Sequence, residues 1–215
     1  MIRAVVFDLD GVLLQSEEVW DSVRERYVRD RGGRYDEAVQ RAMMGMSAPE
    51  WSAYLHDQAG VRDDPETINR DVVERMLEAY RHHLPLLPGA VEAVRRAAAV
   101  FPLALASSSN REVFEEVLAL AGIADCFRAT VSAEEVERGK PAPDVYLEAA
   151  RRLGVSPDRC TAVEDSHAGI RSAKTAEMRV VAIPNATYPP DDEALELADV
   201  VVGSLDELTV DVLRG

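Results

Sequence analysis

The sequence is 215 residues long, which is enough for one domain or for one domain with an inserted segment. Its 24 basic and 39 acidic residues give a net charge of −15. Nucleic acids and anionic membranes call for basic surfaces, so this charge argues against both as partners. An anionic substrate would need a local positive feature, such as a metal ion, a lysine or the N-terminus of a helix.

The sequence also predicts a cytoplasmic protein, which we expect to be a monomer. No apolar stretch approaches the roughly 20 residues that span a bilayer. Asp8 and Asp10 interrupt the apolar N-terminus, which is therefore unlike a signal peptide. Cys126 and Cys160 lie far apart among apolar neighbours, and we expect two buried thiols in a reducing compartment rather than a disulfide or a metal site.

The first predicted element is a buried strand over residues 2–7, an apolar run that ends in Asp8, Asp10 and Gly11. Side chains alternate along a strand, so the two aspartates project to the same side, at the mouth of the sheet. Two carboxylates held this close repel each other, which favours a shared proton or a bound cation. One could act as a nucleophile and the other as a general acid. The alternative is a pair of turn residues, because Asp and Gly are common turn formers.

Residues 16–85 contain no convincing strand and are predicted to be helical. The first helix carries an apolar stripe at helical spacing, formed by Val19, Trp20, Val23, Tyr27 and Val28. The last helix begins at Asp64, a typical N-cap, with Pro65 at its first position. Two shorter helices are expected between them. Residues 84–89 then form a linker, because proline breaks the helix there.

Helices and strands alternate along the rest of the chain. The predicted strands are Leu103–Ser107, 129–132, Cys160–Glu164, 180–183 and a short one at 200–202. Helices are predicted over residues 89–99, 111–121, Asp144–Leu153, 167–176 and 205–213. This alternation indicates an α/β fold, with a parallel sheet that is covered on both faces.

Three further segments carry reactive side chains. Ser107 opens a Ser-Ser-Ser-Asn run at one strand end, Glu164 and Asp165 close another, and Lys140 lies between them in Gly-Lys-Pro. Taken singly, each has an ordinary interpretation as a helix N-cap or a surface turn. Together with Asp8 they supply a nucleophile, a hydroxyl, an ammonium and a second acidic pair. Open parallel sheets bind ligands at the carboxyl ends of their strands, which favours a shared site.

In this order and spacing, the segments resemble the four motifs of the haloacid dehalogenase superfamily. The first motif is matched by residues 7–12, the second by Ser107, the third by Lys140 and the fourth by residues 163–166. The resemblance covers nearly the whole chain. It is closest to the subgroup that contains small-metabolite phosphatases, such as phosphoglycolate phosphatase, and β-phosphoglucomutase-like proteins.

The resemblance implies a Rossmann-like parallel-sheet core formed by residues 1–15 and 86–215. It further implies that residues 16–85 are a helical cap domain inserted after the first strand. The predicted helical stretch has the place in the chain that such a cap requires.

The resemblance also implies the roles of the acidic residues. Asp8 attacks phosphorus and forms an aspartyl-phosphate, while Asp10 protonates the leaving group and later activates water. One Mg2+ is bound by the carboxylates of Asp8 and Asp165 and by the backbone carbonyl of Asp10.

Phosphate binding is expected from Ser107, Ser108 and Lys140. Ser107 offers its hydroxyl, Ser108 its backbone N–H at a helix start, and Lys140 its positive charge. Glu164 is expected to act indirectly, through Lys140 or a metal-bound water. A cis peptide is expected between Lys140 and Pro141, because only X-Pro bonds adopt cis at low cost.

Substrate choice is expected to lie in the cap, with Trp20, Gly45 and Ser47 as candidate specificity residues. Mutase relatives carry cap cations where this chain has Trp20 and Ala48, so the expected positions offer no clamp for a second phosphate. The sequence therefore favours a Mg2+-dependent phosphatase that acts on a small metabolite such as a sugar phosphate or phosphoglycolate. A phosphosugar mutase is the alternative, and a non-catalytic binding protein is disfavoured because all four motifs are retained.

Overall fold

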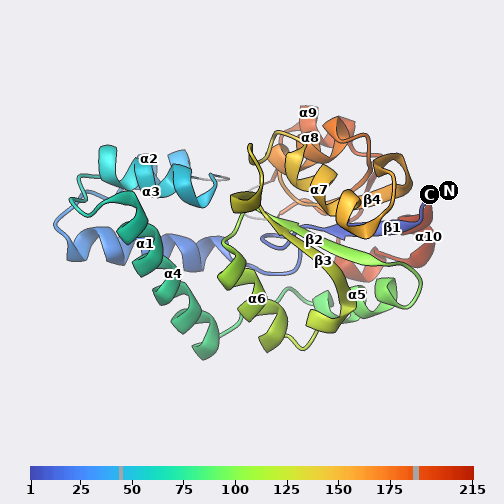
Figure 1. Ribbon diagram of the computed structural model, residues 1–215, viewed down its shortest axis with the longest axis horizontal. Coiled ribbons are helices and arrows are strands. Elements are labelled where there is room, and N and C mark those ends of the chain that lie inside the picture. Colours follow the sequence, from blue (N-terminus) through green and yellow to red (C-terminus); the bar gives the residue numbers. More distant parts are fainter. Residues whose placement is uncertain (44–45, 186–188) are drawn as a thin grey trace.

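The computed structural model describes residues 1–43, 46–185 and 189–215. Its centre is a six-stranded parallel sheet with the strand order β3-β2-β1-β4-β5-β6. The strands are β1 (Ala4–Phe7), β2 (Leu103–Ser107), β3 (Phe127–Ser132), β4 (Cys160–Glu164), β5 (Arg179–Ala182) and β6 (Val200–Val201). Helices lie on both sides of the sheet (Figure 1). The Rossmann-like α/β fold expected from the sequence is confirmed.

The strands form where short apolar runs can be buried from both sides. Every residue of β1, β2 and β4 is buried, as is usual in parallel sheets with two covered faces. β1 lies between β2 and β4, with Val5 opposite Leu103 on one side and Thr161 on the other. Because these strands run in the same direction, their carboxyl ends meet at one edge of the sheet, where ligands of such folds bind.

Helices pack on the sheet in two layers. They are α5 (Ala90–Ala98), α6 (Arg111–Leu120), α7 (Asp144–Leu153), α8 (His167–Thr175), α9 (Asp192–Leu197) and α10 (Val210–Arg214). In Figure 1, α7, α8 and α9 lie above the sheet, and α5 and α6 lie below it. Alternate residues of the strands enter two different hydrophobic cores: Val5 and Leu105 belong to one, Val6 and Ala104 to the other. This alternation is the two-residue period of a strand.

Four further helices form a group beside the sheet, at the left of Figure 1. They are α1 (Glu17–Asp30), α2 (Glu37–Met43), α3 (Ala48–Asp57) and α4 (Pro65–His82). The chain enters and leaves this group at one place, because Leu14 pairs with Leu86 and the Gln15 N–H donates to the Pro85 carbonyl at 2.9 Å. One hydrophobic core continues from the sheet into these helices. The domain boundaries inferred from the sequence remain a prediction.

Helix boundaries follow the capping residues. Asp64 caps α4 as the sequence predicts, by accepting the N–H of the third residue after it. The helix expected over 205–213 is shorter, because Leu208 has a non-helical backbone and α10 begins only after Thr209 caps it. Helix α9, which was not predicted from the sequence, begins where Asp191 accepts a backbone N–H.

Within the described ranges, no helix is long and apolar enough to cross a membrane. Both cysteines are free, with Cys160 buried and Cys126 half-buried.

Candidate active site

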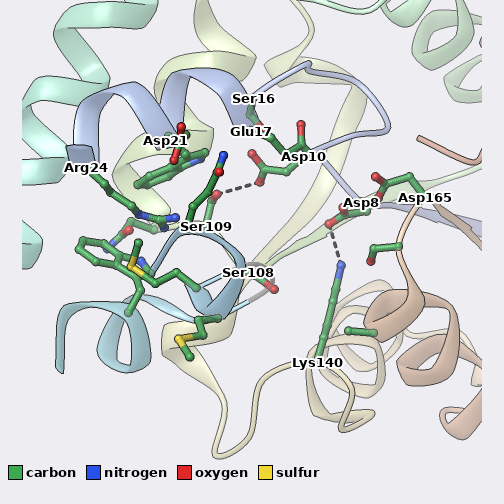
Figure 2. Close-up of a pocket in the computed structure, with 18 of the residues that line it drawn as sticks. Asp8, Asp10, Ser16, Glu17, Asp21, Arg24, Ser108, Ser109, Lys140 and Asp165 are labelled. Carbon is green, nitrogen blue, oxygen red and sulfur yellow. Dashed lines mark hydrogen bonds and ion pairs between the residues drawn. The ribbon is translucent and has the colours of Figure 1, made fainter. Parts of the chain in front are cut away.

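The segments that follow β1, β2 and β4 meet in a cleft between the sheet edge and helices α1, α2 and α3 (Figure 2). Five of the residues that the sequence predicted for catalysis, metal binding or phosphate binding line this cleft: Asp8, Asp10, Ser108, Lys140 and Asp165. Four of them follow parallel strands, and Lys140 reaches the cleft from the loop before α7. The parallel sheet thus brings together residues that lie far apart in the sequence.

Lys140 forms the centre of a buried ionic group. Its Nζ lies 2.7 Å from Asp8 Oδ1 and 2.6 Å from Glu164 Oε1, and the three side chains are at most 7% exposed. Burial alone would lower the pKa of Lys140, but the carboxylates of Asp8 and Glu164 outweigh it and raise the pKa. Lys140 is therefore a fixed positive charge beside Asp8, as a site for a phosphate dianion requires.

Glu164 is fully buried and positions its neighbours. Its Oε1 also accepts the Tyr146 hydroxyl at 2.7 Å, and its Oε2 accepts the backbone N–H groups of Asp165 and Ser166 at 3.0 and 3.2 Å. Burial would raise the pKa of Glu164, but Lys140 and these hydrogen bonds lower it, so the carboxylate stays charged. Both oxygens of Glu164 thus accept hydrogen bonds from protein groups, and its indirect role remains a prediction.

Close packing makes two glycines necessary at this site. A Cβ on Gly169, in α8, would lie 1.8 Å from Glu164 Oε1, and a Cβ on Gly11 would lie 1.8 Å from Asp165 Oδ2. Gly11 also has a φ of +81°, where glycine is favoured. The need for glycine at position 169 was not predicted from the sequence. The expected cis peptide between Lys140 and Pro141 is confirmed.

Asp10 is held by two hydroxyls from the loop after β2. Its Oδ2 accepts the Ser109 hydroxyl at 2.7 Å and the Ser107 hydroxyl at 3.3 Å, while Ser107 Oγ in turn accepts the Ser109 N–H. Ser107 is fully buried, and Ser108 and Ser109 line the cleft. Ser109 was not singled out in the sequence, although the three-serine run was visible.

The donor set fits a hard divalent cation. Carboxylate oxygens of Asp8, Glu164 and Asp165 lie within 4.8 Å of one another, and Asp165 Oδ1 is buried without a hydrogen-bond partner among the described residues. Burial raises the pKa of Asp8 and of Asp165, and their acidic neighbours add to both shifts. Three carboxylates thus lie together beside a single ammonium, and Asp10 adds a further negative group next to Asp8. A bound cation would offset this excess of negative charge, and Mg2+ prefers carboxylate oxygens as ligands.

The helical wall of the cleft contains a cation that the sequence analysis missed. Arg24 follows Trp20 by four residues on α1, so both share one face of the helix and both line the cleft. The guanidinium carbon lies 4.7 Å from the centroid of the Trp20 ring and 4.8 Å from that of Trp51. Positions 20 and 48 carry no cation, as the sequence indicated, but Arg24 supplies one elsewhere in the cap.

Of the other two candidate specificity residues, Ser47 does not line the cleft. Ser47 stands at the start of α3, where its N–H and its hydroxyl donate to Glu50 at 2.7 and 2.6 Å. Among the described residues of this segment, Met46 rather than Ser47 lines the cleft. Gly45 lies outside the described residues.

Comparison with known proteins agrees with this geometry. Residues 2–177 match the family model of the haloacid dehalogenase-like hydrolases. The chain is 35% identical over 218 residues to hexitol phosphatase B of Escherichia coli, covering all of this chain and 97% of that protein. It is 32% identical over 185 residues to the fructose-1-phosphate phosphatase YqaB of Escherichia coli, covering 82% of this chain and 94% of that protein.

Among solved structures, a mutant of CbbY from Rhodobacter sphaeroides in complex with xylulose-(1,5)bisphosphate superposes with a TM-score of 0.88 at 28% identity, covering both chains completely. Segments of all four motifs line one cleft here, and the relative that covers all of this chain at 35% identity is a hexitol phosphatase. The chain therefore belongs to the haloacid dehalogenase-like hydrolases, in the subgroup of phosphatases and β-phosphoglucomutase-like proteins, and is an enzyme of the phosphoric monoester hydrolase type.

Proposed function

We propose that this protein is a Mg2+-dependent phosphatase that hydrolyses a small phosphorylated sugar or related metabolite through an aspartyl-phosphate, acting as a cytoplasmic monomer with residues 16–85 as its cap domain. The observation that most directly supports this proposal is the contact between Lys140 Nζ and Asp8 Oδ1, at 2.7 Å, in the cleft. The names of the full-length hexitol phosphatase and of the fructose-1-phosphate phosphatase support a sugar or sugar-alcohol phosphate as substrate.

Asp8 is the proposed nucleophile because it is the buried carboxylate that contacts Lys140 and also lines the cleft. Lys140 and the backbone N–H of Ser108 hold the phosphoryl oxygens, so that negative charge can approach phosphorus. Asp8, Asp165 and the carbonyl of Asp10 would hold Mg2+, which when bound neutralises charge on the phosphoryl group.

Asp10 is the proposed general acid and base. The hydroxyls of Ser109 and Ser107 both donate to its Oδ2, which fixes the orientation of the carboxyl group. Its Oδ1 is buried with no hydrogen-bond partner in the described structure and is therefore free to carry the proton. Asp10 gives that proton to the leaving alkoxide and later takes one from the attacking water.

Phosphate release from sugar monophosphates tests the proposal. We expect activity with Mg2+, loss of activity with EDTA, recovery when Mg2+ is restored, and poor support by Ca2+, whose larger coordination sphere loosens the geometry at phosphorus. Full activity in metal-free buffer would rule out the mechanism.

A phosphosugar mutase is the second candidate, because a mutase needs a cap cation for the second phosphate of its intermediate and Arg24 is a cation on the cap side of the cleft. However, Asp10, Glu17 and Asp21 in the same lining oppose a second anion. The deciding assay offers β-glucose 1-phosphate with a trace of the 1,6-bisphosphate and follows glucose 6-phosphate and inorganic phosphate. We expect phosphate release. Fast conversion to glucose 6-phosphate with little free phosphate would identify a mutase.

A further inference from the structure

Polar atoms without protein partners gather on the cap side of the cleft. Asp10 Oδ1, Ser16 Oγ, Glu17 Oε2 and Arg24 Nε are all buried, and none has a hydrogen-bond partner in the part of the chain that the structure describes. All four residues line the same cleft. Leaving a buried polar group unpaired costs about 1–3 kcal/mol. Because this set mixes donors with acceptors, it matches a ligand that offers both.

Arg24 is held in this set by contacts with two aromatic rings. The rings of Trp20 and Trp51 lie against its guanidinium, and Arg24 has no ion pair among the described residues. Burial lowers the pKa of Arg24 to about 10, so the group stays charged at neutral pH. A guanidinium that is stacked in this way keeps its N–H groups for a ligand in the cleft.

Asp21 provides an acceptor on the same helix. It lines the cleft, and its Oδ1 accepts the Tyr35 hydroxyl at 2.7 Å, which holds the carboxylate in place. Figure 2 shows Asp21 and Arg24 on the same side of the cleft, opposite Lys140. The cap wall therefore presents one fixed donor group and one fixed acceptor group.

The charges on this wall disfavour a second anion. Arg24 and Lys140 are the two cationic side chains among the described lining residues, and Lys140 is already committed to Asp8 and Glu164. The space around Arg24 also faces the acidic side chains of Asp10, Glu17 and Asp21. A second phosphate or carboxylate would be repelled by these groups, whereas a neutral hydroxyl could pair with donors and acceptors alike.

We propose that Arg24, together with Asp21, is a specificity-determining site that binds hydroxyl groups of the leaving part of a monophosphorylated sugar or sugar alcohol and disfavours substrates with a second anionic group. This inference rests on the proposed phosphatase function and extends it to the part of the substrate away from the reacting phosphate. Ring contacts with Trp20 and Trp51 hold Arg24 in the position that this role needs.

Three six-carbon phosphates that differ only in what the cap would contact provide the test: n-hexyl phosphate, sorbitol 6-phosphate and 6-phosphogluconate. For the wild type we expect kcat/KM to be highest for sorbitol 6-phosphate. Arg24→Gln should lower kcat/KM for sorbitol 6-phosphate by about tenfold to a hundredfold, mainly by raising KM. The same substitution should change kcat/KM for hexyl phosphate by less than about threefold. Asp21→Asn, which removes a negative charge from the cap wall, should raise kcat/KM for 6-phosphogluconate relative to that for sorbitol 6-phosphate.

The matched control is Arg29→Gln, on the same helix, where the arginine is exposed and paired with Glu25. Arg29→Gln should leave kcat/KM unchanged for all three substrates. A wild-type preference for 6-phosphogluconate that Arg24→Gln abolishes would mean that Arg24 binds a second anion, and the proposal would be wrong. An equal loss on all three substrates with Arg24→Gln would reduce Arg24 to a structural role and would also refute it.

Binding can be followed without turnover. The chain has two tryptophans, and both contact Arg24, so their fluorescence reports on this part of the cleft. In the Asp8→Asn background with Mg2+, we expect sorbitol 6-phosphate to change the emission at concentrations where hexyl phosphate does not, and Arg24→Gln to weaken that binding about tenfold or more. A protein that binds in this way but never releases phosphate would refute the proposed function and not this inference.

Discussion

At the scale of single residues, the site depends on one ammonium shared by two acids. Lys140 contacts Asp8 and Glu164 at 2.7 and 2.6 Å, and a buried charge that loses its partner costs several kcal/mol. Of the two acids, only Asp8 lines the cleft. Glu164 therefore holds Lys140 in position, and Asp8 is the acid of the pair that can react with a substrate in the cleft.

Asp8→Asn should abolish turnover and leave the fold intact. The amide has the shape of the carboxyl group and can still accept the Lys140 hydrogen bond, but it cannot form the aspartyl-phosphate. Phosphate release with Mg2+ and a circular-dichroism melt measure the two effects. The control is Asp30→Asn, an exposed acid paired with Arg75, which should keep full activity. Turnover of Asp8→Asn within tenfold of the wild type would remove Asp8 from the nucleophile role.

Glu177→Gly should stabilise the protein without changing its activity. Glu177 is the described non-glycine residue with a positive φ, 64°, just after α8 ends. A side chain there carries a conformational cost that glycine avoids. We expect the free energy of unfolding to rise by about 0.5–1 kcal/mol, measured by urea denaturation.

The reverse substitution serves as the control for Glu177. Gly154 ends α7 with a φ of 67°, and a Cβ there would meet no atom within 4 Å. Gly154→Ala should therefore destabilise the protein by about 1 kcal/mol through backbone conformation alone. If Glu177→Gly lowers the melting temperature instead, contacts of the Glu177 side chain outweigh its backbone strain.

At the scale of elements, the start of α8 fixes the fourth motif. Ser166 caps this helix by accepting the Gly169 N–H at 3.1 Å, and the Ser166 N–H and hydroxyl donate to Glu164. Gly169 presents its bare backbone to the same carboxylate. Ser166 thus caps the helix, and the first turn of the helix holds the Glu164 carboxylate through hydrogen bonds and close packing.

Gly169→Ala should therefore damage activity from a position outside the cleft. The new methyl would lie 1.8 Å from Glu164 Oε1 and must displace the carboxylate that holds Lys140. We expect a loss of about 1–3 kcal/mol in the free energy of unfolding and a fall in kcat of about a hundredfold. Gly139→Ala is the control, because its Cβ would meet only ordinary contacts at 3.8 Å. Wild-type kcat in Gly169→Ala would show that Glu164 does not need this position.

At the scale of the whole molecule, the excess of negative charge links stability to pH and metal. The chain carries a net charge of −15, and the carboxylates of Asp8, Glu164 and Asp165 lie close together beside Lys140. Burial, reinforced by Glu164 and Asp10, raises the pKa of Asp8 to about 8 in the folded protein. A cation bound there would favour the charged carboxylates and stabilise the fold.

Metal-free protein should lose stability as the pH rises from 6 to 8. Between the unfolded pKa of Asp8, about 4, and its folded pKa, the folded state binds more protons than the unfolded state. The free energy of unfolding then falls with rising pH. Thermal melts in EDTA measure the slope, which should be smaller in Asp8→Asn and should flatten with excess Mg2+. A melting temperature that rises from pH 6 to pH 8 in EDTA would contradict the raised pKa.

The sequence by itself determined the fold class, the chain positions of most strands and helices, and the residues at the mouth of the sheet. It could do so because period-two and helical patterns, proline and glycine breaks and strand-end acids are local, and because parallel strands bring their carboxyl ends together. Short elements such as α9, whose six residues give little periodicity, escaped it.

Only the tertiary structure decided which side chains complete the site. Ser109 on Asp10, Tyr146 on Glu164 and the Arg24 guanidinium against the Trp51 ring each join different segments of the chain. Arginines and serines are common on protein surfaces, so no local pattern marks the ones that fold brings into a cleft. Burial and the loss of competing water give these particular contacts their energy, and both exist only once the chain has packed.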